Sequence, residues 1–167
     1  MDSDELRRLQ SPLKERYRAD PSAAFLTLRA EGSLDDTNVS CSVQTGQALV
    51  EAGLHPATGG DGSLACSGDM LLQALVACAG VTLRSVATNR GIEVTGRIRA
   101  EGDLDFRGTL GVDRSAPIGF TAIRLLFDLD SNVGQDELEA LIATTERYCV
   151  VYQTLAQPPD VSVIAGG

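Results

Sequence analysis

Apolar side chains dominate one stretch of the chain, from residue 69 to residue 89. It contains no proline, a single glycine, and apolar residues on every side of a helical wheel. A helix that is apolar all round is buried on all sides. Ser67 or Asp69 offers a side-chain cap for the first turn, and Gly91 stands where a left-handed residue would end the helix. The pattern predicts a long core helix, with Cys78 near its middle.

Alternation with a period of two marks the predicted strands. Residues 92–101 and 120–130 alternate between apolar and polar positions, which is typical of antiparallel neighbours with one solvated face. Shorter stretches at 24–29, 39–44 and 161–164 also predict strands. With the core helix, these strands place the chain in the α+β class.

Helical spacing recurs at both ends of the chain. The first residues predict one or two short helices, and we assign an N-terminal arm to 1–21 and a single domain to 22–167. Ser131-Asn132 is predicted to cap a second helix, with Cys149 on its inward side. Residues 150–156 predict a further short helix, which Pro158-Pro159 ends.

The charge balance narrows the possible partners. The chain of 167 residues carries a net charge of −9 and no basic run, which argues against nucleic acid and anionic membranes as partners. Gln73 interrupts the apolar stretch and Arg84 closes it, so we do not expect a membrane span. The first ten residues are polar and charged, without an apolar core, so we expect a cytoplasmic protein.

Four cysteines, at widely spaced positions, are the candidate chemical groups: Cys41, Cys66, Cys78 and Cys149. No pair forms a CxxC motif and His55 is the only histidine, so we expect neither a metal site nor a bound cofactor. A free cysteine is most often a buried packing residue, and that interpretation stays open for each of them.

Cys78 and Cys149 suggest a specific chemistry if folding brings them together. A thiolate attacks the O–O bond of a peroxide and becomes a sulfenic acid, which a second thiol converts to a disulfide. Cys149 precedes a predicted helix start, which would stabilise its thiolate. Cys78 lies several turns into its helix, so its activation would require a neighbouring side chain.

Four segments, in order, resemble the OsmC/Ohr family. They are GDMLLQALVACAGVTL at 68–83, EGDLDFRGTLG at 101–111, IGFTAIRLLFDLD at 118–130, and the ERYC-VV-xx-L run at 146–155. The resemblance implies an OsmC-like fold, with antiparallel sheets wrapped around a long buried core helix in an intertwined homodimer. It also implies a thiol peroxidase that reduces organic hydroperoxides in oxidative stress defence.

On this resemblance, Cys78 is the peroxide-attacking thiol and Cys149 the resolving thiol. An external dithiol, lipoyl-linked or a small thiol, would serve as reductant. Leu75 and Val81 flank Cys78 and favour an alkyl or fatty-acid hydroperoxide, held in an apolar pocket at the dimer interface.

The chain departs from the family at the positions that activate the thiol. Peroxidase members often have Pro-Glu before the core helix, whereas this chain has Ser67-Gly68-Asp69. Asp69 is the only acid available there, and Arg29 is the candidate activating arginine, with a solvated strand residue as the alternative. Two other functions therefore stay open. One is a non-catalytic dimer that binds a small apolar ligand, and the other is a thiol-based redox sensor or disulfide reductase.

Overall fold

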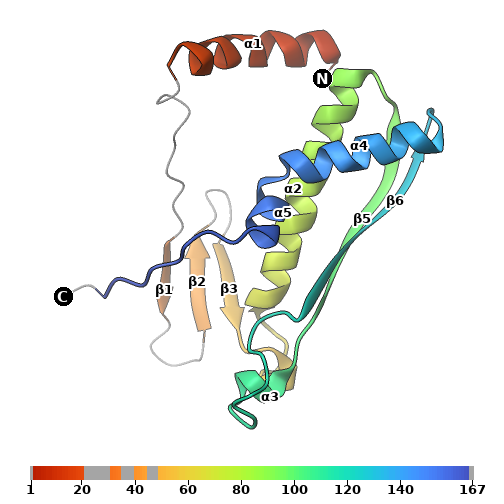
Figure 1. Ribbon diagram of the computed structural model, residues 1–167. Coiled ribbons are helices and arrows are strands. Elements are labelled where there is room, and N and C mark those ends of the chain that lie inside the picture. Colours follow the sequence, from red (N-terminus) through yellow and green to blue (C-terminus); the bar gives the residue numbers. More distant parts are fainter. Residues whose placement is uncertain (1, 21–30, 35–39, 45–48, 166–167) are drawn as a thin grey trace. The chain divides into compact units, whose positions relative to one another are not determined.

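The structure is a computed structural model that describes residues 2–20, 31–34, 40–44 and 49–165 (Figure 1). The chain forms two compact units, each built from separate segments of sequence. The first unit comprises Met1–Arg7, Ala74–Arg99 and Leu126–Gly167, and the second comprises Arg8–Gln73 and Ala100–Leu125. Helix α1 (Ser3–Ala19) spans most of the expected N-terminal arm. The proposed domain limits, 1–21 and 22–167, stay a prediction.

A four-stranded sheet lies in the second unit. Its strands are β1 (Glu31–Leu34), β2 (Ser40–Gln44), β3 (Leu49–Gly53) and β4 (Ala65–Cys66), in the order β1-β2-β3-β4. The first two pairings are antiparallel, whereas β3 and β4 are parallel. Strand β2 confirms the prediction for 39–44, while the strand predicted over 24–29 lies outside the described residues. A short 3₁₀ helix, η2 (Pro56–Thr58), follows β3.

The two alternating stretches form a second sheet, of strands β5 (Val94–Asp103) and β6 (Ala122–Ser131). The Asn132 backbone N–H donates to Glu93 at one end, and Thr121 donates to Asp103 at the other, so the strands run antiparallel. The charged side chains of β5 and β6 are exposed, which confirms the predicted solvated face.

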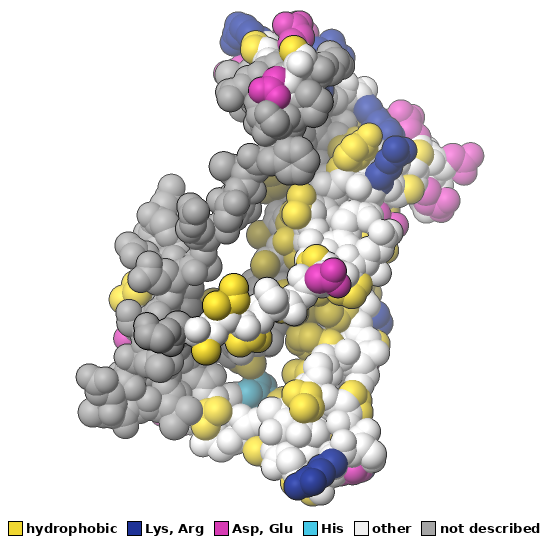
Figure 2. All heavy atoms as spheres, turned by 60° about the vertical axis from the view of Figure 1, so that its left-hand side comes forward, with side chains coloured by type: hydrophobic (Ala, Val, Ile, Leu, Met, Phe, Trp, Pro, Cys, Tyr) yellow, Lys and Arg dark blue, Asp and Glu magenta, His cyan; other side chains and the backbone are white. Residues whose placement is uncertain are grey.

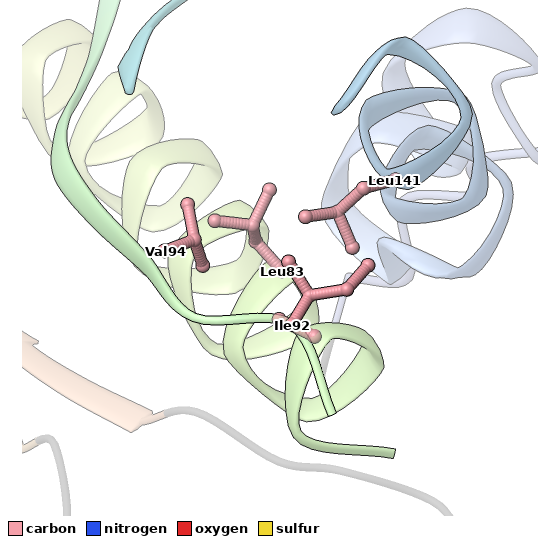
Figure 3. Packing of buried hydrophobic residues seen from close by; sticks show 5 residues of the cluster. Leu83, Ile92, Val94 and Leu141 are labelled. Atoms are coloured by element: carbon pink, nitrogen blue, oxygen red, sulfur yellow. The ribbon is translucent and has the colours of Figure 1, made fainter. Parts of the chain in front are cut away.

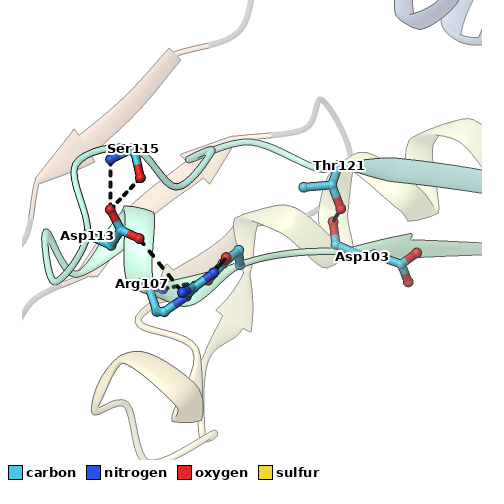
Figure 4. A network of polar contacts seen from close by, with 6 residues as sticks. Asp103, Arg107, Asp113, Ser115 and Thr121 are labelled. Atoms are coloured by element: carbon cyan, nitrogen blue, oxygen red, sulfur yellow. Dashed lines mark hydrogen bonds and ion pairs between the residues drawn. The ribbon is translucent and has the colours of Figure 1, made fainter.

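The segment between β5 and β6 is held by a network of polar contacts (Figure 4). Asp105 caps the short helix α3 (Phe106–Thr109) by accepting a hydrogen bond from the Arg107 backbone N–H. The Arg107 guanidinium pairs with Asp105 at 2.6 Å and with Asp113 at 3.7 Å. Asp113 in turn accepts hydrogen bonds from the backbone and hydroxyl of Ser115. This network fixes the loop within the 101–111 segment that carries the family resemblance.

Helix α2 (Ser67–Arg90) ends where the sequence predicts. Gly91 has a φ of 70°, a left-handed conformation that glycine adopts without a steric penalty. Its backbone N–H donates to the Thr88 carbonyl and that of Ile92 donates to the Ala87 carbonyl, at 3.2 and 2.9 Å. These two bonds form a Schellman motif, which satisfies carbonyls that the last helical turn leaves free.

Burial of α2 differs from the prediction. Its buried residues are spaced by four along one stripe: Leu75, Ala79, Leu83 and Ala87. Val81 is 73% exposed, so the expected burial on all sides is not found in the single chain. One chain supplies packing partners for one stripe only, whereas the apolar residues surround the helix. On length and composition alone α2 is also able to cross a membrane, a test that the core helices of soluble proteins pass as well.

Helix α4 (Gln135–Tyr148) begins later than the sequence predicts. Its N-cap is Gly134, without a side-chain hydrogen bond, so the prediction of Ser131-Asn132 as the cap is wrong. The Asn132 side chain instead accepts a hydrogen bond from the Glu93 backbone N–H at 3.0 Å and closes the end of the β5–β6 sheet. An Asn side-chain oxygen accepts a hydrogen bond from a free N–H within reach, and here that N–H belongs to Glu93, the residue before β5.

The C-terminal segment contradicts the last predicted strand. Helix α5 (Val150–Ala156) has the predicted limits, but the residues from 158 to 165 have no regular secondary structure. Val161 and Val163 are 86% and 95% exposed. A strand forms only against a hydrogen-bonding partner, and an alternating pattern does not supply one by itself. In the space-filling view of Figure 2, hydrophobic side chains, drawn in yellow, are exposed on the surface of this face of the molecule.

The core of the first unit lies where α2, β5 and α4 meet (Figure 3). Its buried members are Leu83, Ala87, Ile92, Val94 and Leu141. Ile92 directly follows Gly91 in the Schellman turn, and its side chain packs in this cluster. Gly96 has a φ of 126°, and a Cβ there would collide with the Asp128 carbonyl oxygen. Glycine therefore allows β6 to approach β5 closely at this point.

Leu141→Ala is expected to destabilise the protein by about 2–5 kcal/mol, because it removes a fully buried side chain and leaves a cavity. Alanine is the best helix former, so any loss reports on packing rather than on α4 itself. Urea unfolding followed by circular dichroism measures the effect. Leu110→Ala, at a position that is 54% exposed, is the matched control and should cost far less. Equal losses in the two variants would contradict the described core.

Candidate functional site

Two cysteines from remote parts of the sequence meet in the first unit. Cys78 lies on α2 and is half-buried, and Cys149 lies between α4 and α5. The two sulfurs lie close enough for each thiol to shift the pKa of the other, with the Cys149 thiol acting as donor toward Cys78. Both thiols are free. The structure therefore brings together the two residues that the sequence singles out, while their chemical roles stay a prediction.

The position of Cys149 follows from a break between two helices. Its backbone is extended, with φ −74° and ψ 107°, so it ends α4 and precedes α5. Its N–H donates to the Thr145 carbonyl and its carbonyl accepts from the Gln153 N–H, each at 2.9 Å. The residue thus belongs to the hydrogen-bond pattern of both helices, and its side chain is 0% exposed.

Several donors surround the Cys78 sulfur. Burial alone raises the pKa of the Cys78 thiol. The Val151 backbone N–H, the Cys149 thiol, the Val150 backbone N–H and the Thr82 hydroxyl all donate to the sulfur, and together they hold that pKa below its ordinary value. Cys78 therefore forms a thiolate at a lower pH than an ordinary cysteine does.

The pKa of Cys149 moves the other way. Burial raises the pKa of the Cys149 thiol, the Tyr152 backbone N–H lowers it, and the adjacent Cys78 sulfur raises it again. The net direction is upward. Environments that move the pKa values of two neighbouring groups apart in this way suit the two groups to different chemical roles. Between the two pKa values, Cys78 is the thiolate and Cys149 is the protonated donor.

This result adds to the expectation about the helix start. The Tyr152 and Val151 N–H groups of α5 do lower the pKa of Cys149, as expected, but burial outweighs them. The sequence argument gives the benefit of the α5 N-terminus to Cys149 and leaves Cys78 dependent on a side chain. In the structure, the backbone N–H groups of Val150 and Val151 donate to Cys78. The reason is geometric, because the free N–H groups of a first helical turn point ahead of the helix, where the α2 thiol lies.

Of the two proposed activating residues, only Asp69 lies in the described part of the chain, and it does not join this centre. Asp69 is exposed and lies in the first turn of α2, nine residues before Cys78. At a rise of about 1.5 Å per residue, that places it about 13 Å away along the helix axis, too far for direct contact. Arg29 lies outside the described residues. No arginine of the described part of the chain donates to the Cys78 sulfur.

Sequence reasoning missed the donors that activate Cys78. The backbone donors of Val150 and Val151 carry no signal in residue identity. Thr82 does carry a signal, because it is four positions after Cys78 on the same helix and residues spaced by four lie on one face. An aliphatic pair flanks the thiol as expected, but Leu75 is buried and Val81 is exposed.

An apolar cavity of about 300 Å³ lies on another side of α2. Val76, Gly80 and Leu83 line it from the helix, and Val94 and Ile98 line it from β5. Val76 and Gly80 project about 160–200° away from Cys78 around the helix axis, given about 100° per residue. This cavity is therefore not the approach to the thiol. Among the residues that the structure describes, no group of three or more metal-binding side chains gathers.

These features define an α+β chain in which a thiol on a long apolar helix meets a second thiol at a helix junction. Residues 60–164, which include both cysteines, match the OsmC-like protein family. The chain belongs to this family. No curated protein matches it.

Solved structures share the fold at low sequence identity. A crystal structure of an OsmC-like protein from Mycoplasma pneumoniae matches with a TM-score of 0.66 and 18% identity, over 80% of this chain and 89% of that one. An organic hydroperoxide resistance protein OsmC from Legionella pneumophila matches at 0.60 and 19%, over 80% and 92%. OhrB of Bacillus subtilis, an organic hydroperoxide resistance protein, matches at 0.54 and 16%, over 81% and 94%. At these identities the likeness establishes the fold alone.

Proposed function

We propose that this protein is a thiol-dependent peroxidase that reduces organic hydroperoxides, with an alkyl or fatty-acid chain, in oxidative stress defence. The observation that carries the proposal is the asymmetric thiol pair. Cys78 has a lowered pKa and a partly exposed side chain, and Cys149 has a raised pKa and lies in contact with it. Membership of the OsmC-like family and fold neighbours named for organic hydroperoxide resistance support the same activity.

The reaction has two steps. The Cys78 thiolate attacks the terminal oxygen of the hydroperoxide, the O–O bond breaks, and the alkoxide leaves and takes a proton to become an alcohol. Cys78 is then a sulfenic acid. The Cys149 sulfur attacks the Cys78 sulfur, the S–O bond breaks, and water leaves with the proton that Cys149 gives up. The product is a Cys78–Cys149 disulfide.

An external dithiol, lipoyl-linked or a small thiol, would reduce this disulfide and complete the cycle. The proposed compartment is the cytoplasm, where thiols are kept reduced. No bound cofactor or metal takes part in the proposed cycle. Cys66 shares no hydrogen bond with either sulfur of the pair in the described structure, so the cycle does not include it.

We also propose that two copies assemble as an intertwined homodimer around α2. The support is the exposed apolar side of this helix, where Val81 and Leu71 are 73% and 38% exposed. Burying apolar side chains contributes about 25 cal/mol for each Å² removed from water. A partner helix is a direct way to cover this side. An apolar approach to Cys78 would then form at the interface.

A non-catalytic protein that binds a small apolar ligand is the second candidate function. The apolar cavity beside Val76 and Gly80 favours it, because it offers space that the thiol pair does not use. The missing Pro-Glu before α2 favours it as well. In that case, the cysteines are packing residues.

A thiol titration tests the proposal. The reduced protein is treated with one equivalent of cumene hydroperoxide, and free thiols are counted before and after. The peroxidase is expected to lose two of its four thiols per chain rapidly and to release one equivalent of cumyl alcohol. A dithiol such as dihydrolipoamide should restore both thiols. An unchanged thiol count in a protein whose circular dichroism spectrum is native would favour the binding function instead.

A further inference from the structure

The apolar cavity beside α2 has a charged group in its wall. Val76, Gly80 and Arg84 line it from the helix, and their spacing of four residues places them along one face. Of the described residues that line the cavity, Arg84 is the only charged one, and Thr95 is the only other one with a polar side chain. The rest of the wall is aliphatic or glycine, so Arg84 determines which polar group a ligand can carry.

The backbone of β5 holds the Arg84 guanidinium at the cavity. Its Nη1 donates a hydrogen bond to the Val94 carbonyl at 2.9 Å, and Val94 itself lines the cavity. Arg107 and Arg124 pair with aspartates, whereas no carboxylate of the described part of the chain pairs with Arg84. A guanidinium has several N–H donors, so Arg84 keeps donors for a ligand after it has bonded to β5.

The cavity has the size of a site for a small molecule. Its volume of about 300 Å³ lies at the lower end of the range for ligand pockets, about 300–1,000 Å³. Val76 and Arg84 are separated by about 12 Å along the helix axis, given a rise of about 1.5 Å per residue. Between them, a Cβ at Gly80 would meet only the Ile98 side chain within 4 Å, at 3.9 Å. A short alkyl chain therefore has space to lie along this face of α2, with its polar end at Arg84.

A carboxylate is the polar end that suits this arrangement. Carboxylate and guanidinium groups form parallel, charge-assisted N–H···O bonds, which are stronger than bonds between neutral groups. The aliphatic wall stabilises an alkyl chain by removing it from water. A neutral alkyl compound would use the wall but not the charge, and a small anion without a chain would use the charge but not the wall.

We propose that this cavity is a binding site for a carboxylic acid with a short or medium alkyl chain, whose carboxylate pairs with Arg84. The chain lies along Val76 and Gly80, which face away from Cys78 around the helix axis. The site is thus separate from the thiol pair. The inference rests on the cavity and on Arg84, and it does not require that the protein reduces hydroperoxides.

Octanoate is the probe that tests the site, and octanol, with the same chain and no charge, is the matched ligand. A titration followed by the methyl NMR signals of Val76 and Ile98 locates the ligand and measures its affinity. The wild type should bind octanoate with a dissociation constant of about 1 mM or below, and octanol more weakly. Arg84→Gln should weaken octanoate binding about tenfold or more and leave octanol binding unchanged. Arg97→Gln, at an exposed arginine of β5 outside the cavity wall, is the matched control and should bind octanoate as the wild type does.

Gly80→Val tests the space for the chain. The added side chain should fill part of the cavity and reduce the binding of both ligands, in a protein with a native circular dichroism spectrum. Gly80→Ala provides a smaller change if valine prevents folding, because alanine is the best helix former.

Four outcomes would overturn the proposal. They are a wild type that binds no octanoate, as when a second copy of the chain fills the cavity, an equal loss of affinity in Arg97→Gln, and unchanged octanoate binding in a folded Gly80→Val or Arg84→Gln protein. If Arg84→Gln does not fold, equal affinities of the wild type for octanoate and octanol would overturn it as well.

Octanoate has no O–O bond and consumes no thiol, so this proposal and the peroxidase fail separately. A wild type that binds octanoate through Arg84 but keeps its thiols in cumene hydroperoxide supports the carboxylate site and refutes the peroxidase. A wild type that loses two thiols and binds no octanoate supports the peroxidase and refutes the carboxylate site.

Discussion

Cys78→Ser is expected to abolish the loss of thiols on treatment with one equivalent of cumene hydroperoxide. The wild type should lose two thiols per chain, and the variant none of its remaining three. A serine hydroxyl is not ionised near neutral pH and is a poor nucleophile toward an O–O bond, whereas the donors around the Cys78 sulfur favour its thiolate. Thiol counting and release of cumyl alcohol measure the effect.

Cys66→Ser provides the matched control, because Cys66 is also a free and partly exposed cysteine. This variant should still lose two thiols, and it should release alcohol at the wild-type rate. A Cys78→Ser protein that continued to lose two thiols would show that another cysteine attacks the hydroperoxide. The described pair would then have no part in that first step.

Cys149→Ser is expected to stop the proposed cycle after its first step, the oxidation of Cys78. Cys78 should still react with the hydroperoxide and release one equivalent of alcohol, but no disulfide should form. One thiol per chain is lost, and Cys78 stays a sulfenic acid that dimedone traps. Excess peroxide should then oxidise it to the sulfinic acid. Turnover with dihydrolipoamide should fall strongly, because an intramolecular partner reacts faster than one from solution.

The buried position of Cys149 requires a second variant. A serine hydroxyl placed there without a partner costs about 1–3 kcal/mol, so Cys149→Ala should be measured beside it. Both variants should give the same product at Cys78. An unchanged loss of two thiols in either folded variant would contradict the resolving role. Intact-mass and peptide spectra identify the species in each case.

Local patterns predict those parts of the fold that depend on neighbours in the sequence. The limits of α2 follow from its apolar run and from Gly91, and the β5–β6 pair follows from alternation on both strands. Residues 161–164 are rich in strand-favouring valine and isoleucine but form no strand, because pairing depends on a partner that the local sequence does not specify. The prediction that Ser131-Asn132 caps α4 is wrong for a related reason. The Asn132 oxygen accepts a hydrogen bond from the Glu93 N–H at the end of a strand, instead of from an N–H at the start of the helix.

The thiol pair shows how much of the candidate site can be predicted from the sequence. Cys78 and Cys149 can each be selected from the sequence, and the family resemblance pairs them. The donors at Cys78 cannot be predicted in this way, since they are backbone N–H groups that depend on where the chain turns between α4 and α5. These donors lower the pKa of Cys78, whereas burial raises that of Cys149. Arg29 lies outside the described residues, so its predicted role stays open.

The unequal exposure of the two sulfurs has a consequence for the order of events. Cys149 has no surface in the chain, whereas part of Cys78 remains open. A molecule arriving from solvent therefore meets Cys78 first, and Cys149 can respond only to what has already happened to its neighbour. In the proposed cycle, this difference in exposure sets the order of the two steps: Cys78 is oxidised first, and Cys149 reacts with it second.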